Sequence, residues 1–389
     1  MSTGLQMIHE LVERTKGIRR AMHSLSIEPN QAKTIDKRYT MKQAETMVGR
    51  SYQAIRDAEN NGKVPKPDMG PNNRRLGFTL EQINRLRDHF GTRPRREDNE
   101  DPIIMAVQNF KGGVGKSTVA VHLAEYLAQS GYRVLLIDCD SQASTTATFG
   151  ILPDDELEEE DTLQPFFYGD EESIEYAIRK TYWNGLDLIP SNLHLYTAEY
   201  RMAEGDWRPE MLLTLRDGID QIKDNYDVIV IDPPPALGFI SLNVLSAANA
   251  LVIPMPPGMY DFYSTISFLT MLEKMLEALS ETIGVDGFKF IKMVITRYSG
   301  NISAESEVVD LMEKVFGHHM LSARLKNSAE VKNAGTRLKT VYELKEPITS
   351  RDVHKRAVNL FDAVNAEIEL LIRKSWPSHA RELSAKGLI

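Results

Sequence analysis

Cysteine is almost absent from this chain of 389 residues, because Cys139 is the only one. A single thiol excludes an internal disulfide and a metal cluster held by several cysteines, and it is typical of a reducing compartment. Long apolar runs are also missing, since no stretch reaches the roughly 18 residues that span a bilayer. The N-terminus contains Glu10 and Glu13 and has no apolar segment of the kind that forms a secretion signal. We therefore expect a cytoplasmic protein without a membrane anchor.

Charge is distributed unevenly along the chain. The first 100 residues hold 19 Lys and Arg against 13 Asp and Glu, which leaves 27 against 42 for the remainder. The length fits two or three domains of roughly 150 residues each, so a small basic unit is expected ahead of a larger acidic one. The polar stretch RPRREDNEDP, residues 93–102, is interpreted as the linker between them. A second polar stretch, residues 153–162, is typical of a solvated acidic loop.

A glycine-rich loop, NFKGGVGKS (109–117), lies between a short apolar run (103–109) and a segment whose apolar residues have helical spacing (117–130). Strand, glycine loop and helix form a mononucleotide-binding unit, in which backbone N–H groups and the helix N-terminus converge on phosphate oxygens. Lys116 is placed to reach the β- and γ-phosphates, and the Ser117 hydroxyl is placed to ligate Mg²⁺. The loop therefore predicts ATP or ADP with Mg²⁺ as cofactors.

Carboxylates end two further apolar strands. RVLLIDCD ends in Asp138 and Asp140, and DVIVID ends in Asp232. The carboxyl ends of parallel strands meet at the ligand-binding edge of such a sheet. One such acid alone is often only a helix or turn cap. Three of them in order, each at a strand end beside a phosphate loop, indicate a nucleotide site much more specifically.

Two more runs, 250–256 and 288–298, are almost continuously apolar, as buried parallel strands are. The pattern predicts a P-loop NTPase fold of the α/β class with a mostly parallel, doubly wound sheet, over residues 103–389.

The glycine loop departs from the common P-loop pattern, because Phe110 stands where the first glycine would be. It matches K-G-G-x-G-K-[ST] instead, the deviant Walker A motif, and here the sequence resembles the ParA/MinD family of P-loop ATPases. The resemblance implies that Lys116 acts on its own nucleotide and that Lys111 crosses a homodimer interface to the partner's nucleotide. A solvated loop lysine is the alternative interpretation of Lys111.

The same resemblance implies roles for the acids. Asp138 supports the metal shell, Asp140 orients or activates the attacking water, and Asp232 holds Mg²⁺ through water. Thr296 and Arg297 are implied to contact the base or ribose. The full set implied to bind the cofactor is Lys111, Gly112, Gly113, Val114, Gly115, Lys116, Ser117, Thr118, Thr296 and Arg297.

The N-terminal unit shows the pattern of a helix-turn-helix. A helical stretch runs through Met47, the chain turns at Val48 and Gly49, and Ser51 is a good N-cap for a second helix. An irregular basic segment and a further capped helix follow, so residues 31–92 look like a winged, MerR-like DNA-binding module. An ordinary helical hairpin is the alternative on spacing alone. The candidate DNA contacts are Arg50, Ser51, Tyr52, Gln53, Arg56, Arg74 and Arg75.

Residues 1–30 contain apolar side chains at roughly heptad spacing. A short helix that pairs with a second copy is one interpretation, and packing within the chain is the other. The residues that show this spacing are Ile8, Leu11, Ile18, Met22 and Leu25.

Over most of its length the chain resembles the large, type Ia (SopA-like) plasmid-partition ATPases. This implies a DNA-segregating ATPase that is cytoplasmic and associated with the nucleoid. Its ATP-bound homodimer binds DNA nonspecifically, a ParB-type partner stimulates hydrolysis, and the N-terminal module represses its own operon. The C-terminal region is implied to carry nonspecific DNA binding, with a solvated basic face as the alternative. Its basic residues are Arg324, Lys326, Lys332, Arg337, Lys339, Arg351, Lys355 and Arg356.

Other classes fit less well or remain open. A membrane-cycling ATPase of the MinD type would end in a basic amphipathic helix, whereas the C-terminal segment contains Pro377 and little apolar face. Nitrogenase-type reductases need bridging cysteines. An operator-binding repressor with a weak or vestigial ATPase, and a RepA protein of a RepABC-type replicon, stay as alternatives.

Overall fold

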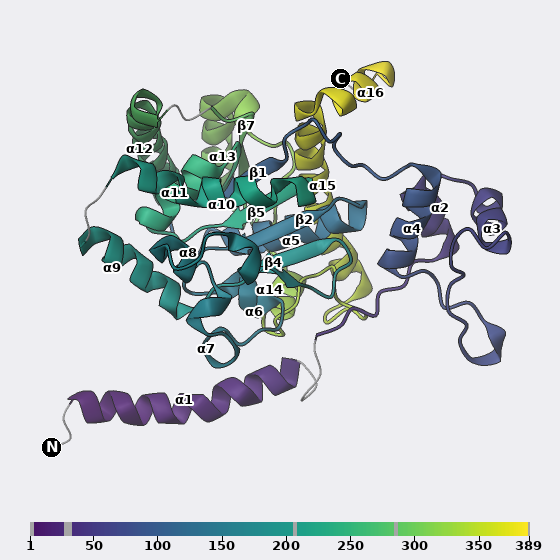
Figure 1. Ribbon diagram of the computed structural model, residues 1–389, viewed down its shortest axis with the longest axis horizontal. Helices are drawn as coiled ribbons and strands as arrows, with labels where there is room; N and C mark the ends of the chain where they lie inside the picture. Colours follow the sequence, from purple (N-terminus) through teal and green to yellow (C-terminus); the bar gives the residue numbers. More distant parts are fainter. Residues whose placement is uncertain (1–3, 27–32, 205–207, 284–286, 388–389) are drawn as a thin grey trace.

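The computed structural model describes residues 4–26, 33–204, 208–283 and 287–387. Its centre is a seven-stranded sheet with the order β3-β4-β2-β5-β1-β6-β7 (Figure 1). Every neighbouring pair is parallel except β3 with β4, which is antiparallel at the edge. The strands are β1 Ile103–Val107, β2 Val134–Asp138, β3 Arg179–Lys180, β4 Leu186–Ile189, β5 Val228–Asp232, β6 Ala250–Met255 and β7 Phe290–Ile295. The predicted mostly parallel α/β sheet is confirmed.

Helices cover both faces of the sheet (Figure 1). Successive strand residues point to opposite faces, so Ile103 and Met105 join one apolar core whereas Ile104 and Ala106 join the other. The first core packs under α5 Lys116–Ser130 and α15 Arg351–Ser375. The second packs under α10 Thr214–Ile222, α11 Phe239–Ala247, α12 Met259–Ile283 and α13 Ser303–Phe316. The shorter helices are α6 Ser144–Thr148, α7 Pro153–Glu156, α8 Gln164–Tyr168, α9 Tyr196–Glu204, α14 Ala329–Gly335 and α16 Pro377–Ala385.

A small helical unit lies to one side of the sheet (Figure 1) and contains α2 Met41–Val48, α3 Tyr52–Asn60 and α4 Leu80–Phe90. The side chains of Thr40, Ser51 and Thr79 accept a backbone N–H at the N-terminus of each helix. Gly49 ends α2 in the left-handed region with φ of 67°, which lets α3 turn away within a few residues. Helix, tight turn and capped helix follow the boundaries expected from the sequence.

Residues 93–102, interpreted above as a linker, are held against the larger unit. The buried Arg96 donates from Nε to the Tyr226 carbonyl at 3.1 Å and from Nη2 to the Lys223 carbonyl at 3.1 Å. Arg87 of α4 reaches across to the Gln129 carbonyl of α5 at 2.9 Å. The basic unit is therefore docked on the sheet domain by buried guanidinium contacts.

The N-terminal helix α1, Gly4–Ser26, lies apart from the rest of the chain in Figure 1. Leu5, Ile8 and Leu11 are exposed. Ile18, Met22 and Leu25 lie beyond the residues whose side chains are described, so pairing of this helix with a second copy stays a prediction. None of the helices in the described ranges is both long enough and apolar enough to cross a bilayer.

Candidate nucleotide-binding site

The glycine loop joins the end of β1 to the start of α5. Gly113 and Gly115 adopt left-handed φ values of 74° and 101°, which side chains rarely tolerate and which turn successive N–H groups to one side. Thr296, at the end of β7, donates its hydroxyl to the Val114 carbonyl at 2.7 Å. This contact holds the loop at the carboxyl edge of the sheet, where ligands of such folds bind.

The two loop lysines point in different directions. Lys116 is buried and lines a pocket of about 630 Å³, and burial lowers the pKa of its ammonium group, partly offset by Asp232 and Asp140. Lys111 is not among the described residues that line this pocket. Its Nζ pairs with Asp261 Oδ1 at 2.6 Å, on the first turn of α12, and its side chain is 38% exposed. One lysine is therefore ready to meet a phosphate in this pocket, whereas the other is directed away from it.

The three predicted acids meet beside the loop. The Asp140 N–H donates to Asp138 Oδ1 at 3.1 Å, and β2 pairs with β5 so that Asp138 stands opposite Asp232. Burial raises the pKa of both Asp138 and Asp232, and their mutual repulsion adds to the effect on Asp138. Burial also raises the pKa of Asp140, against the opposing pull of Lys116. A cation bound here would favour the charged form of all three.

The residues present fit a magnesium ion that is shared with a nucleotide. The buried Asp232 Oδ1 has no hydrogen-bond partner in the described part of the chain, and the nearby Ser117 hydroxyl favours the charged form of this carboxyl. Among the described residues, no three His, Cys, Asp or Glu side chains are close enough to hold a cation. Mg²⁺ ordinarily takes one or two protein oxygens and completes its shell with water and phosphate. Ser117 and Asp232, with Asp138 behind them, would hold it in that way.

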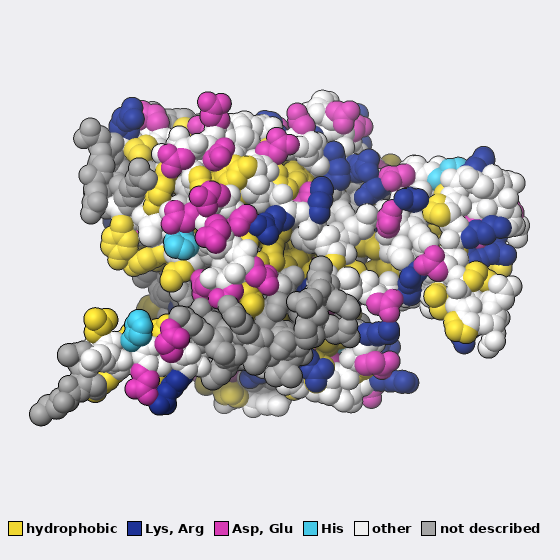
Figure 2. Space-filling view, turned by 60° about the horizontal axis from the view of Figure 1, so that its bottom comes forward, with side chains coloured by type: hydrophobic (Ala, Val, Ile, Leu, Met, Phe, Trp, Pro, Cys, Tyr) yellow, Lys and Arg dark blue, Asp and Glu magenta, His cyan; other side chains and the backbone are white. Residues whose placement is uncertain are grey.

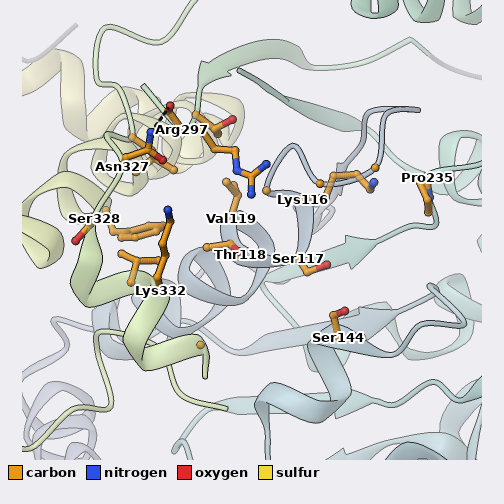
Figure 3. Close-up of a pocket in the computed structure, with 18 of the residues that line it drawn as sticks. Lys116, Ser117, Thr118, Val119, Ser144, Pro235, Arg297, Asn327, Ser328 and Lys332 are labelled. Carbon is orange, nitrogen blue, oxygen red and sulfur yellow. Dashed lines mark hydrogen bonds between the residues drawn. The ribbon is translucent and has the colours of Figure 1, made fainter. Parts of the chain in front are cut away.

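The far wall of the pocket comes from segments after β7 (Figure 3). Lys116 and Ser117 lie toward one end, Asn327 and Lys332 lie at the other, and Arg297 extends between them toward the loop. Arg297 has a left-handed φ of 54°, and Asn327 Nδ2 donates to its carbonyl at 2.8 Å. Such strained backbone is retained mainly at functional sites.

Sequence reasoning missed most of this wall. The residues of the whole pocket lining that it did not assign are Val119, Gln142, Ser144, Pro235, Leu325, Asn327, Ser328, Val331, Gly335 and Phe361. The sequence gives no local signal for residues 325–335, because α13 separates them from the end of β7 and only the fold brings them to the ligand-binding edge.

The candidate DNA contacts of the N-terminal unit divide into two groups. Some are exposed or cap a helix, and the others are paired with a buried carboxylate. Tyr52 and Gln53 are exposed on α3, and Arg50 is exposed beside the Phe90 ring. Ser51 serves as the N-cap of α3, with Ala54 N–H donating to its hydroxyl at 3.4 Å. Arg74 is exposed in the segment between α3 and α4.

Arg56 and Arg75 are already paired. Both contact the buried carboxylate of Glu59, Arg56 at 3.0 Å and Arg75 at 2.9 Å. Each guanidinium stays about one-third exposed, with side-chain values of 32% and 29%. The pairing ties α3 to the segment that precedes α4. Figure 2 shows Lys and Arg side chains gathered on this unit, whereas acids are spread over the face of the larger one.

The C-terminal basic residues differ in their contacts. Lys326 and Lys332 line the nucleotide pocket, and Arg324 pairs with Glu313. Exposed positions remain at Arg337, Arg351, Lys355 and Arg356, with Lys339 partly exposed.

Comparison with known proteins gives the same fold. Residues 103–285 match the family model described as an AAA domain. The chain is 36% identical to protein SopA of Escherichia coli K12 over 388 residues, which covers 97% of this chain and 98% of SopA. It is 33% identical to a candidate replication protein A of Rhizobium rhizogenes, which covers 91% of each chain.

Solved structures share the fold. A partition protein aligns with 95% of this chain and 99% of its own, at a TM-score of 0.66 and 22% identity. An ATP complex of a Cyanothece McdA variant aligns with 68% of this chain and 97% of its own, at a TM-score of 0.56 and 22% identity. With a whole-length relative at 36% identity, the chain belongs to the family of ParA-type partition ATPases.

Proposed function

We propose that this protein is a Mg²⁺-dependent ATPase that segregates DNA by switching between a monomer and an ATP-bound homodimer. The dimer binds nucleoid DNA in the cytoplasm without sequence preference. A ParB-type partner stimulates ATP hydrolysis, which releases the protein from the DNA. The N-terminal helix-turn-helix represses its own operon. Lys116 holds the phosphates in cis, Asp140 orients the attacking water, and Ser117, Asp138 and Asp232 serve the metal. When held by these residues, Mg²⁺ would supply positive charge to the transferred phosphoryl group.

The orientation of Lys111 carries this proposal. Lys111 is in the nucleotide loop, yet its ammonium group lies on Asp261 of α12 and outside the pocket that Lys116 enters. A cation directed away from its own pocket in this way is placed to meet the triphosphate of another molecule. Occupancy of the pocket by ATP then favours the dimer, because the ligand binds the dimer better than the monomer.

Exposed aromatic side chains next to Lys111 support a dimer at this face. Tyr260 and Tyr263 flank Asp261 on α12, and they are 86% and 62% exposed. Met259 and Ile266 extend the same apolar surface at helical spacing. Exposed groups of this kind mark protein contact sites more often than free surface, and Tyr is enriched in such contacts.

DNA binding by the purified full-length chain tests the function as a whole. We expect random-sequence duplex DNA to bind with Mg-ATP and not with Mg-ADP. If about six phosphates are contacted, affinity should fall about a thousandfold between 50 and 200 mM salt. A duplex from upstream of its own coding sequence should bind through the helix-turn-helix, with ADP as well. A repressor with a vestigial site would bind that duplex alone and would hydrolyse no ATP with DNA and partner present.

Replacing Asp140 by alanine should trap the ATP-bound state on DNA. A positioned base or water-orienting group contributes roughly 10²–10⁴-fold to rate, so hydrolysis should fall by that factor while nucleotide affinity changes little. The Asp140 carboxylate also accepts the Gln142 N–H at 2.9 Å. Asp140→Asn keeps an acceptor for that bond, so it serves as the matched variant. Turnover at the wild-type rate in both variants would remove Asp140 from the mechanism.

A further inference from the structure

Two adjacent threonines on α6 hold the two buried acids of the site. Thr145 donates its hydroxyl to Asp232 Oδ2 at 2.8 Å. Thr146 donates both its N–H and its hydroxyl to Asp138 Oδ2, at 2.8 and 2.7 Å. Both threonines are fully buried. Helix α6 begins directly after Ala143, whose left-handed φ of 51° is unusual for a residue with a side chain.

The two threonines differ in what else they contact. The Thr146 hydroxyl also accepts the Ser191 N–H at 2.9 Å, so it joins the end of β2 to the chain that follows β4. Thr146 therefore has a structural role that does not depend on any ligand. The hydroxyl of Thr145 points to the carboxylate of Asp232, which ends β5.

Thr145 makes the two oxygens of Asp232 unequal. Oδ2 is occupied by the Thr145 hydroxyl, whereas Oδ1 is buried and has no hydrogen-bond partner in the described ranges. A carboxylate can rotate about its bond to Cβ, and a donor on one oxygen fixes that rotation. The oxygen without a partner then keeps one direction.

We propose that Thr145 is a positioning residue for Mg²⁺, which aims Asp232 Oδ1 at the water shell of the ion. This inference rests on the proposed function, because it assumes that Mg-nucleotide binds in this pocket. Mg²⁺ requires near-ideal octahedral geometry, so a carboxylate that is free to rotate supports it poorly. Partners that orient the groups around a metal typically change metal affinity by about 10–100-fold when they are removed.

Binding of a fluorescent N-methylanthraniloyl ATP to the full-length chain, titrated with MgCl₂, tests this role. In Thr145→Val, which keeps the side-chain shape, the Mg²⁺ concentration for half-maximal binding should rise about tenfold or more. Binding in EDTA should not change. Thr145→Ser restores the hydroxyl and should restore the wild-type Mg²⁺ dependence. If valine is not accommodated, Thr145→Ala removes the same donor with less volume.

A double-variant cycle separates positioning from structure. In the Asp232→Asn background, Thr145→Val should cause no further shift in Mg²⁺ dependence, because the two groups act as one. Unchanged Mg²⁺ dependence in Thr145→Val and Thr145→Ala would overturn the proposal, and so would an equal loss of binding with Mg²⁺ and with EDTA. If the wild-type chain itself bound nucleotide without any response to Mg²⁺, the proposed function would fail instead.

Discussion

Lys116→Ala is expected to weaken nucleotide binding strongly and to remove the steps that depend on it. Lys116 is the buried cation of the pocket, and the Lys111 carbonyl, at 3.4 Å, is a weak partner for its Nζ. A hydrogen bond to a charged group contributes up to about 3 kcal/mol, so the affinity for ATP should fall by roughly a hundredfold. ATP-dependent dimerisation and nonspecific DNA binding should then disappear. Equilibrium binding of a fluorescent ATP to the variant measures the first loss directly.

The matched variant for this prediction is Lys116→Met, which keeps the apolar stem and removes the charge. Loss of affinity in both variants, with unchanged thermal unfolding in the absence of nucleotide, assigns the effect to the ammonium group. Wild-type affinity in Lys116→Met would show that packing of the stem, and not phosphate contact, explains the burial of this residue.

Lys111→Ala is expected to keep ATP binding by the monomer and to lose the dimer. Binding of ATP to the monomer should remain close to wild type, because Lys111 does not line the pocket. The ATP-dependent dimer should be lost, and hydrolysis should fall by at least about a hundredfold, since cations supplied in trans to phosphoryl transfer contribute about 10³–10⁵. Light scattering and steady-state hydrolysis on the same samples measure both effects.

Two control variants test whether the effect of Lys111→Ala comes from the lysine itself. Asp261→Asn breaks the same ion pair from the other side and leaves the lysine free, so the dimer should still form. Lys180→Ala removes another lysine paired with an aspartate, at 2.7 Å, on the edge strand β3. It should leave dimerisation and hydrolysis unchanged. Equal loss of monomer ATP affinity in Lys111→Ala and Lys116→Ala would refute separate roles for the two lysines.

The nucleotide site could be predicted because its signals are local in the sequence. Gly113, Gly115 and Lys116 lie within four residues of one another. Asp138 and Asp232 directly end apolar strands, and Asp140 follows two residues after Asp138. The parallel topology then brings these strand ends to one edge. The starts of α3 and α4 could also be predicted, because Ser51 and Thr79 are N-caps with strong local preferences.

Features that depend on contacts distant in the sequence could not be predicted. The ion pair of Lys111 with Asp261 joins residues 150 positions apart, and spacing within the loop cannot show which way a lysine points. Charge and the family resemblance assign Lys326 and Lys332 to DNA binding, whereas only the fold places them in the pocket wall. The linker interpretation of residues 93–102 followed from their polarity, whereas Arg96 is buried because backbone carbonyls satisfy its guanidinium group.

Mixing two inactive variants tests the action of Lys111 in trans most directly. Lys111→Ala retains Asp140 and lacks the crossing lysine, and Asp140→Ala retains the lysine and lacks the water-orienting acid. In a mixed dimer, one site has its own Asp140 and receives Lys111 from the other subunit. Our account predicts ATP hydrolysis by the mixture well above the sum of the two separate rates. A mixture that hydrolyses no more ATP than this sum, although mixed dimers are shown to form, would contradict it.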